Sequence, residues 1–362
     1  MTITIVNSLP EDQWRHYVEN HPEGNVFHTP EMFQVFNRTK GHKAELCAAT
    51  KNGRLLALFI PVTITLMGGV LYYFTTRAVA YGSVLCSWNE EGKDALEKLL
   101  RWYTMEVKRK EIFTEFRNIS DLSELQPAFK KCDVKFEEYL NYLIDLNQPE
   151  TEMWLKLQKK IRQQIRKARD SGVIIEEVTE SQKLAIVYQL LDQVFTRARV
   201  PLVSISLFEA AFDILAPRDM LKIIMARVGE HYIGAHIILT YKERIFDWYV
   251  ASDRAFSSYH AEPLMLWWFL QWGKEHKFRL FDFGGAGKPD KEYGVREFKA
   301  KFGGELVSFG RNIFVHSPFL FGLSKVGYGI WRSLISRGTN KRDGKRPEAD
   351  HSKSIIKGSQ GI

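Results

Sequence analysis

The stretch "LKIIMARVGEHYIGAHIILTYKERIFDWYVAS" (residues 221–252) consists of apolar runs separated by two short polar turns. Runs rich in β-branched and aromatic residues, bounded by such turns, are typical of antiparallel strands. We therefore expect strands at about 221–228, 232–241 and 244–251. An earlier stretch, "ELCAATKNGRLLALFIPVTITLMGGVLYYFTT" (45–76), has the same arrangement about 176 residues upstream. A repeat of this length is too large for a solenoid unit and predicts two similar α/β domains.

The segments around both copies extend the repeat. "VFHTPEMFQVF" (26–36) precedes the first copy in the register in which "LVSISLFEAAF" (202–212) precedes the second. After the second copy come the loop "SDRAFSSYHAE", a helix with Pro263 in its first turn, and the strand "RLFDFGG". Helix, three antiparallel strands, loop, helix and strand is the element order of the GNAT acyltransferase fold. The sequence thus predicts two tandem GNAT-like domains, each a mixed, mostly antiparallel sheet flanked by helices.

The repeat and the composition between its copies divide the chain into five parts. The first GNAT-like domain is expected at 1–150 and the second, with the active site, at 173–316. A basic helix at 151–172 links them. An amphipathic helix is expected at 317–336, followed by a disordered basic tail at 337–362. The amphipathic helix could pack on the domain or dock on an anionic membrane surface.

The uncharged run from Leu55 to Thr76 is 22 residues long, enough to cross a membrane. Pro61 and the pair Gly68-Gly69 interrupt it, and they suit strands joined by a tight turn. The matching turn in the second copy is "YKER", which is too polar for lipid. The run therefore favours a soluble hairpin. Three scattered cysteines and the absence of a secretory signal suit a reducing cytoplasm, and they indicate neither a zinc site nor disulfides.

The net charge of +8 is concentrated in two places. The segment Lys156–Arg169 holds seven basic and no acidic residues, and the tail Arg337–Lys357 holds seven basic and three acidic residues. These segments contribute +7 and +4, so the remainder of the chain carries about −3. A local excess favours two anionic contact zones over a generally basic protein. We expect no DNA partner.

The stretch "FDFGGAGKPDKEYGVREFKAKFGG" (281–304) contains two misleading patterns. Its D-F-G letters hold magnesium in protein kinases, but no H-R-D motif or glycine-rich ATP loop accompanies them. Its G-G-A-G-K letters suggest a phosphate loop, but Pro289 follows Lys288 where Ser or Thr is required. Neither a kinase nor a P-loop enzyme is predicted, and no metal is implied.

Two motifs resemble the Fem-type transferases. "WLKLQKKIRQQIRKARDSGV" is similar to their basic segment, and "FDFGG…YGVREFKAKFGGELVSFG" is similar to their closing signature. The positions that match the basic segment are Lys160, Arg162, Ile165, Arg166, Ala168 and Gly172. The resemblance covers about residues 25 to 316 and agrees with the repeat, because Fem-type proteins are two GNAT-like domains in tandem.

The resemblance implies transfer of an aminoacyl group from aminoacyl-tRNA to an amine of a peptidoglycan precursor, while relatives use acyl-CoA. Two departures leave the donor open. The loop "SDRAFSSYHAEP" has no glycine, although CoA-binding GNAT enzymes carry a glycine-rich phosphate loop there. The helical hairpin of the tRNA-dependent relatives has no room between Gly172 and Pro217. No bound cofactor is expected, and the implied acceptor is an anionic lipid-linked or nucleotide-linked precursor at the inner face of the membrane.

The candidate catalytic residues are Lys299, at the family's F-K position, and Asp282. Lys299 could neutralise charge on the acyl carbonyl or bind a donor phosphate. Asp282 could be a general base or could hold a turn beside the glycines; Asp247 is a second candidate base. The candidate substrate-binding residues are Arg162, Arg166, Tyr249, Ser252 and Arg254. Trp248 and Tyr249 should face opposite ways by strand alternation.

Two other readings compete with a Fem-like transferase. One is a CoA-dependent N-acetyltransferase of a nucleotide sugar. The other is a non-catalytic double-GNAT protein that holds tRNA or a lipid-linked sugar through the basic helix. Substitution of Lys299 and Asp282 separates an enzyme from a binding protein, because only an enzyme loses turnover while keeping its ligand.

Overall fold

The computed structural model describes residues 2–65, 75–106 and 109–323. They form two compact units, and each unit is built around its own sheet. Of the described residues, the first unit comprises those up to Glu138 and those from Phe309 to 323, and the second comprises Tyr139–Ser308. The fold class is confirmed, because both units are mixed α/β with mostly antiparallel sheets.

The second unit has seven strands in the order β14-β8-β13-β12-β11-β10-β9. All neighbours are antiparallel except β12 and β13. The strands are β8 (Leu140–Asp145), β9 (Ile174–Glu177), β10 (Leu221–Val228), β11 (His231–Tyr241), β12 (Arg244–Ser252), β13 (Leu280–Gly285) and β14 (Glu305–Ser308). The helices are α6 (Glu150–Lys156), α7 (Lys159–Asp170), η5 (Ser181–Lys183), α8 (Leu184–Ala198), α9 (Ser206–Leu215), η6 (Ala216–Arg218), η7 (Arg254–Tyr259), α10 (Ala261–Glu275) and α11 (Gly294–Ala300).

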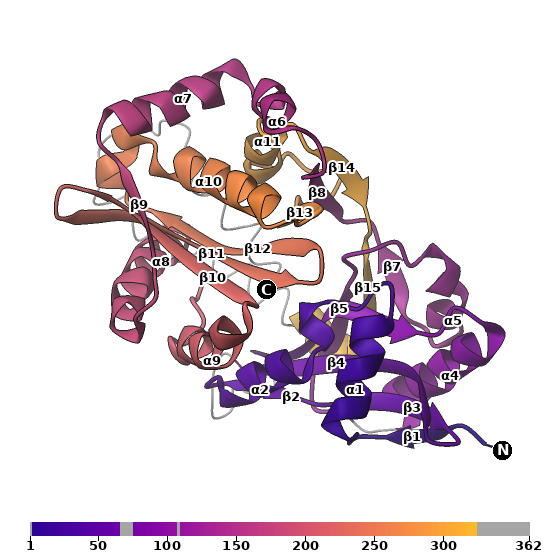
Figure 1. Ribbon diagram of the computed structural model, residues 1–362. Helices are drawn as coiled ribbons and strands as arrows, with labels where there is room; N and C mark the ends of the chain where they lie inside the picture. The colour runs from indigo at the N-terminus through magenta and orange to yellow at the C-terminus, as the bar shows by residue number, and fades with distance from the viewer. Residues whose placement is uncertain (1, 66–74, 107–108, 324–362) are drawn as a thin grey trace. The chain divides into compact units, whose positions relative to one another are not determined.

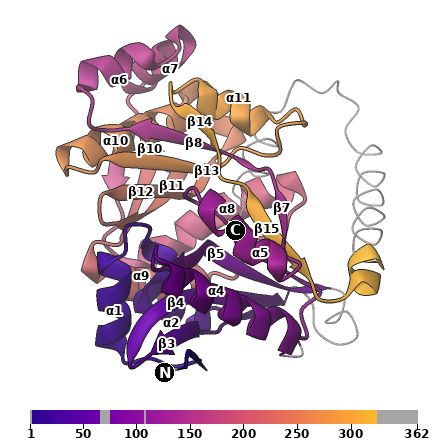
Figure 2. The same ribbon diagram turned by 90° about the vertical axis from the view of Figure 1, so that its right-hand side faces the viewer.

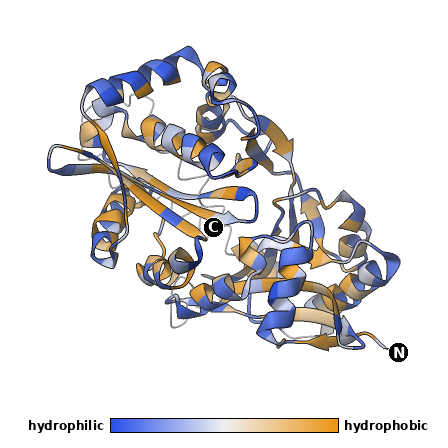
Figure 3. Cartoon of the chain, in the orientation of Figure 1, coloured by the Kyte–Doolittle hydropathy of each residue, from blue (hydrophilic) through white to orange (hydrophobic). Residues whose placement is uncertain are grey.

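Helices cover both faces of this sheet (Figure 1). The helix α10 lies along one face, and α8 and α9 lie on the other. Because α10 is apolar on almost every side, it can be buried between the sheet and the outer helix α7. The amphipathic α7 contributes Ile161, Ile165 and Ala168 to that contact. Its outer surface is hydrophilic along its length (Figure 3).

The first unit repeats this arrangement with the order β1-β3-β4-β5-β6-β15-β7, and β2 pairs with β4. The strands are β1 (Thr4–Val6), β2 (His42–Ala44), β3 (Cys47–Lys51), β4 (Arg54–Thr65), β5 (Thr76–Cys86), β6 (Phe113–Arg117), β7 (Lys135–Glu137) and β15 (Arg311–Val315). The helices are α1 (Glu11–Asn20), η1 (Val26–His28), α2 (Pro30–Arg38), α4 (Glu90–Arg101), the π-helical turn η3 (Trp102–Glu106), η4 (Ser123–Leu125) and α5 (Gln126–Lys131).

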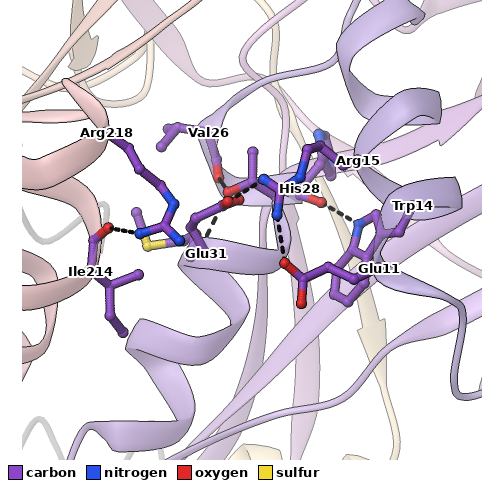
Figure 4. A network of polar contacts seen from close by, with 10 residues as sticks. Glu11, Trp14, Arg15, Val26, His28, Glu31, Ile214 and Arg218 are labelled. Atoms are coloured by element: carbon purple, nitrogen blue, oxygen red, sulfur yellow. Dashed lines mark hydrogen bonds and ion pairs between the residues drawn. The ribbon is translucent and has the colours of Figure 1, made fainter.

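Side-chain contacts attach η1 and α2 to α1 in this unit (Figure 4). The indole Nε1 of Trp14 donates to the carbonyl oxygen of His28 at 2.6 Å. Arg15 forms ion pairs with Glu11 on its own helix and with buried Glu31 on α2. These contacts fix η1, which packs on β5.

The predicted repeat is present. The helices α2 and α9 begin 176 residues apart, and the hairpins β3–β4 and β10–β11 follow them in both units. The order of neighbouring strands is also the same, with β5 and β6 parallel in one sheet and β12 and β13 parallel in the other. The turn that should join the first copy's second and third strands falls at 66–74, outside the described residues.

The structure divides the chain differently from the sequence prediction. The strand β8 lies inside the predicted first domain (1–150), but it pairs with β13 and β14 in the second sheet. The strand β15 lies inside the predicted second domain (173–316), but it pairs with β6 and β7 in the first sheet (Figure 2). Each sheet therefore receives one inner strand from the other half of the sequence.

Two further predictions meet the structure in part. The linking helix predicted at 151–172 is two helices, α6 and α7, because Leu157 and Gln158 have extended backbones. Residues 324–336 of the predicted amphipathic helix, and the tail at 337–362, lie outside the described residues. Within the described part of the chain, no helix combines the length and apolar character needed to cross a membrane.

Candidate active site

The central sheet of the second unit opens between β12 and β13. The two strands pair at three positions, from Arg244–Leu280 to Phe246–Asp282. Beyond Asp247, β12 continues along β11 and β13 continues along β8, with no further pairing between them. Two neighbouring parallel strands that part in this way leave backbone groups to which an extended ligand can bond.

The side chain of Lys299 lies at this opening. It projects from α11 and is 6% exposed, and its Nζ donates to the carbonyl oxygens of Phe283 and of Gly285, the latter at 2.8 Å. Burial lowers the pKa of Lys299 to about 8, against the opposing effect of Asp247 and Asp282. The ammonium group is thus fixed by β13, and its pKa lies only slightly above neutral pH.

Asp282 is fully buried on β13. Its Oδ1 accepts a hydrogen bond from the backbone N–H of Gly284 at 2.7 Å, and Gly284 has a φ of +66° that favours glycine. Burial raises the pKa of Asp282, while Arg244 and the Gly284 N–H oppose the rise. This geometry matches the turn-holding alternative for Asp282, and its catalytic role stays a prediction.

Three more ionisable groups lie on the α10 side of the sheet. The His236 Nε2 and the Asp247 Oδ1 are 2.8 Å apart, and His236 packs edge-on against Phe269 of α10. Glu262, in the first turn of α10, is half-buried. Burial and, to a smaller extent, the charge of Asp247 raise the pKa of Glu262 to about 7, while a contact with Ser252 opposes the rise. The opening is therefore lined by acids as well as by Lys299.

Sequence reasoning missed His236 and Glu262. The available signal was the strand alternation, which puts His236 and Asp247 on the α10 face beside Ile238 and Ile245. A histidine and an aspartate within an apolar stripe indicate a functional site more strongly than an isolated motif residue does. Glu262 stands next to Pro263, whose position predicts only the start of a helix.

Trp248 and Tyr249 do not face opposite ways, so that prediction is wrong. The register between β11 and β12 shifts at Ile237–Ile238, which adds Trp248 as a bulge residue and interrupts the alternation. Both rings pack against Phe208 of α9, with centroid distances of 6.1 Å and 4.9 Å. Both are buried, and contact of Tyr249 with substrate stays a prediction.

The remaining predicted substrate residues occupy three different settings. Ser252 ends β12 beside Glu262, and Arg254 is exposed at the start of η7. Arg162 turns back to α6 and donates to the carbonyl oxygens of Leu155 at 2.8 Å and Leu157 at 2.9 Å. Arg166 is exposed, with its guanidinium 5.6 Å from the Trp154 ring. Arg162 is thus bonded to the protein itself through one guanidinium nitrogen, and its contact with substrate stays a prediction.

Two other cations of α7 approach the start of α10. Burial, followed by the charges of Lys167 and Lys160, lowers the pKa of His260, which precedes α10 directly. Both lysines are exposed, and neither takes part in an ion pair among the described residues. Backbone N–H groups of a helix N-terminus and nearby cations together suit a phosphate group. Within the described ranges, no group of three or more metal-ligating side chains occurs.

Residues 156–299 match the family model described as "Acetyltransferase (GNAT) domain". No relative was found among curated protein sequences. Among solved structures, FemX is 15% identical, with 89% of this chain and 99% of that chain covered and a TM-score of 0.68. The C-terminal domain of a protein named as a lysylphosphatidylglycerol synthetase from Agrobacterium fabrum is 13% identical, with coverages of 88% and 95% and a TM-score of 0.55.

A tandem GNAT protein from the clavulanic acid biosynthesis pathway is 10% identical, with coverages of 88% and 99% and a TM-score of 0.53. At these identities the solved structures bear on the fold, and the family model bears on the chemistry. The fold agrees with the predicted repeat, and the matched segment contains Lys299, Asp282, Asp247 and Glu262. Residues 156–299 therefore match the GNAT acetyltransferase domain, and the fold of the whole chain is similar to that of FemX.

Proposed function

We propose that the protein transfers an acyl or aminoacyl group to an amine of a cell-envelope precursor, either of peptidoglycan or of a polysaccharide. The single observation that carries the proposal is the setting of Lys299. Its ammonium group is fixed on two carbonyl oxygens of β13, at the opening of the sheet and close to Asp247 and Asp282. A cation fixed in this way can stabilise the oxyanion of a tetrahedral intermediate.

The acids at the opening supply the second requirement of the reaction, which is removal of a proton. The amine nitrogen attacks the acyl carbon, a C–N bond forms, and the donor's C–O or C–S bond breaks. The attacking nitrogen loses one proton, and the leaving oxygen or sulfur gains one. Glu262 and Asp247 are the groups proposed to accept the nitrogen's proton, since a carboxyl with a pKa of about 7 is suited to general base catalysis.

The donor is proposed to lie along the opened edge of β12, with its phosphate at the start of α10. Lys160, Lys167 and the backbone N–H groups after His260 are placed to bind that phosphate. Both aminoacyl-tRNA and acyl-CoA carry phosphate and serve as co-substrates rather than bound cofactors. The acceptor is proposed to be an anionic lipid-linked or nucleotide-linked precursor, reached from the cytoplasm with peripheral contact at the membrane.

The test is a panel of donors and acceptors, with acetyl-CoA and mixed aminoacyl-tRNA as donors and precursor peptides or amino sugars as acceptors. For the pair that turns over, Lys299→Met should lower kcat by about 100-fold or more, since an oxyanion contact contributes on that scale. Lys291→Met is the matched control, because Lys291 is exposed and lies in the same motif.

Full turnover by Lys299→Met would rule out the proposed site. Turnover of amino sugars with acetyl-CoA alone would instead assign a CoA-dependent N-acetyltransferase. Binding of an aminoacyl-tRNA or a precursor without turnover in any combination would point to the non-catalytic alternative.

A further inference from the structure

The internal repeat identifies a second polar site, in the first unit, at the position that corresponds to Asp282. In each sheet, one parallel strand pair shows the correspondence. Val79 pairs with Glu115 in the first sheet as Phe246 pairs with Asp282 in the second. The residues "TEFR" (114–117) thus correspond to "FDFG" (281–284), and Phe116 and Phe283 both face the core helix of their unit.

The same register gives the other members of the site. Two residues before Val79, and so on the same face of its sheet, β5 carries Arg77. Two residues before Phe246, β12 carries Arg244 at the corresponding position. Arg117 stands where β13 has Gly284, and Arg311 of β15 pairs with Arg117 in register. The second unit keeps this face open with glycine, whereas the first unit fills it with arginine. We call Arg77, Tyr81, Glu115, Arg117 and Arg311 the arginine cluster.

Contacts within the arginine cluster centre on one carboxylate. The Arg117 Nη2 lies 3.2 Å from the Glu115 Oε2, and Arg311 also forms an ion pair with Glu115. The Arg117 guanidinium lies 5.2 Å from the centre of the Tyr81 ring. The charge of Arg77 also lowers the pKa of Glu115, so three guanidinium groups lie near a single acid.

The cluster carries a surplus of positive charge in a buried place. Glu115 and Arg117 are each 6% exposed. Burial alone would raise the pKa of Glu115, but Arg117, Arg311 and Arg77 together lower it well below the usual range. Burial lowers the pKa of Arg117, whose guanidinium nevertheless stays charged. Even with Glu137, which lies opposite Arg311 in the register, the cations outnumber the anions. Burying unbalanced charge is costly unless a counter-ion is present.

Two hydrogen-bond donors in the cluster lack an acceptor. The Arg77 Nε and the Tyr81 hydroxyl are buried and have no hydrogen-bond partner among the described residues. The Tyr81 ring is held by stacking on Phe27 and Phe36, with centroids 5.6 Å and 5.3 Å away, so its hydroxyl is fixed in position. Buried donors in native proteins are almost always paired, which indicates an acceptor group that belongs here.

We propose that the arginine cluster is a binding site for a phosphate or carboxylate group. Both groups present oxygen atoms that accept from guanidinium and hydroxyl donors, and both neutralise the surplus charge. The site belongs to the first unit, so it does not depend on the acyl-transfer chemistry proposed for the second. Arg77 and Arg311 are half-buried, which leaves the cluster a solvent-facing side.

The test is calorimetric titration of the full chain with inorganic pyrophosphate and with malonate, at constant ionic strength. Arg77→Gln should weaken binding at least tenfold, and Tyr81→Phe should weaken it two- to fivefold. Arg54→Gln is the matched control, because Arg54 is in the same unit, is 64% exposed and also pairs with a glutamate. Binding of pyrophosphate alone indicates a phosphate ligand, and binding of malonate alone indicates a carboxylate ligand.

A second comparison separates this site from the lysines of α7. The double variant Lys160→Gln/Lys167→Gln and the variant Lys299→Met should both retain the binding event that Arg77→Gln weakens, even where a separate event at the lysines is lost. Loss of binding in the lysine variants with full binding in Arg77→Gln would overturn the proposal, as would equal weakening by Arg54→Gln or no binding of either anion. Should Arg77→Gln fail to fold, Tyr81→Phe alone decides, since it removes one oxygen atom and keeps the stacked ring.

Discussion

Lys299 and Glu262 have pKa values shifted toward each other, to about 8 and about 7. In the proposed reaction Glu262 must be deprotonated and Lys299 must be protonated. Both conditions are satisfied best at a pH between these two pKa values. We predict a bell-shaped dependence of kcat/KM on pH, with an acid limb near 7 and an alkaline limb near 8. Lys299→Arg, where it retains activity, should extend activity to higher pH, because arginine does not lose its proton. A rate that stays constant from pH 7 to 10 would contradict the role of Lys299.

Glu262 should also make the fold sensitive to pH. Its pKa is raised in the folded state, from 4.5 to about 7, so protonated Glu262 favours folding and this contribution is lost as the pH rises from 4.5 to 7. At pH 8, Glu262→Gln should increase the free energy of unfolding by on the order of 2 kcal/mol, with little change at pH 4.5. Urea unfolding at both pH values measures this, with Glu275→Gln on the exposed end of α10 as control. Equal effects at both pH values would exclude Glu262 as the cause.

Residue positions were predictable where a motif fixed them. The F-K position singles out Lys299 as a candidate, and the structure shows that it is buried and bonded to β13. The orientation of Tyr249 was not predictable, because a single bulge residue reverses the alternation and leaves no distinct mark in the sequence. Glu262 was not predicted, because its raised pKa results from burial in the folded chain. The sequence around Glu262 does not reveal that burial.

At the scale of elements, Arg162 joins α6 to α7. It donates to three carbonyl oxygens at the C-terminal end of α6, those of Trp154, Leu155 and Leu157. Arg162→Gln should therefore lower the free energy of unfolding by about 1–3 kcal/mol, since hydrogen bonds from a charged group contribute on that scale. Urea unfolding measures the loss, and Arg166→Gln, on the exposed face of α7, is the control. A change in anion binding with unchanged stability would instead support the binding role expected from the sequence.

The break between α6 and α7 shows what a helical pattern cannot reveal. The apolar residues Trp154, Leu157, Ile161, Ile165 and Ala168 keep one helical period across it, so the pattern predicts one helix. The backbone at Gln158 is nevertheless extended, and its N–H donates to the Lys301 carbonyl oxygen at 2.9 Å. That partner is more than a hundred residues away in the sequence. No glycine or proline marks the break, and only the tertiary contact explains it.

At the scale of the whole molecule, the order of strands and helices was predictable and the assignment of two strands was not. The strands β8 and β15 have ordinary strand sequences and follow β7 and β14 closely in the chain. The local sequence does not show whether such a strand pairs with strands from its own half of the chain or from the other half. Both sheets offer the same kind of gap for it. In the second sheet the gap lies between β13 and β14 and is filled by β8. In the first sheet it lies between β6 and β7 and is filled by β15.

This exchange of strands predicts which fragments can fold. Residues 139–308 contain every strand of the second sheet, whereas 151–316 lacks β8 and includes β15, whose partners β6 and β7 are absent. Without β8, β14 has no strand partner and β13 loses one edge of its ladder. We therefore expect 139–308 to unfold cooperatively on heating and 151–316 to show no cooperative transition, as measured by circular dichroism and amide hydrogen exchange. Cooperative unfolding of 151–316 at the temperature of 139–308 would mean that β8 is dispensable. In that case the boundary at residue 150, read from the repeat alone, would describe an independent domain after all.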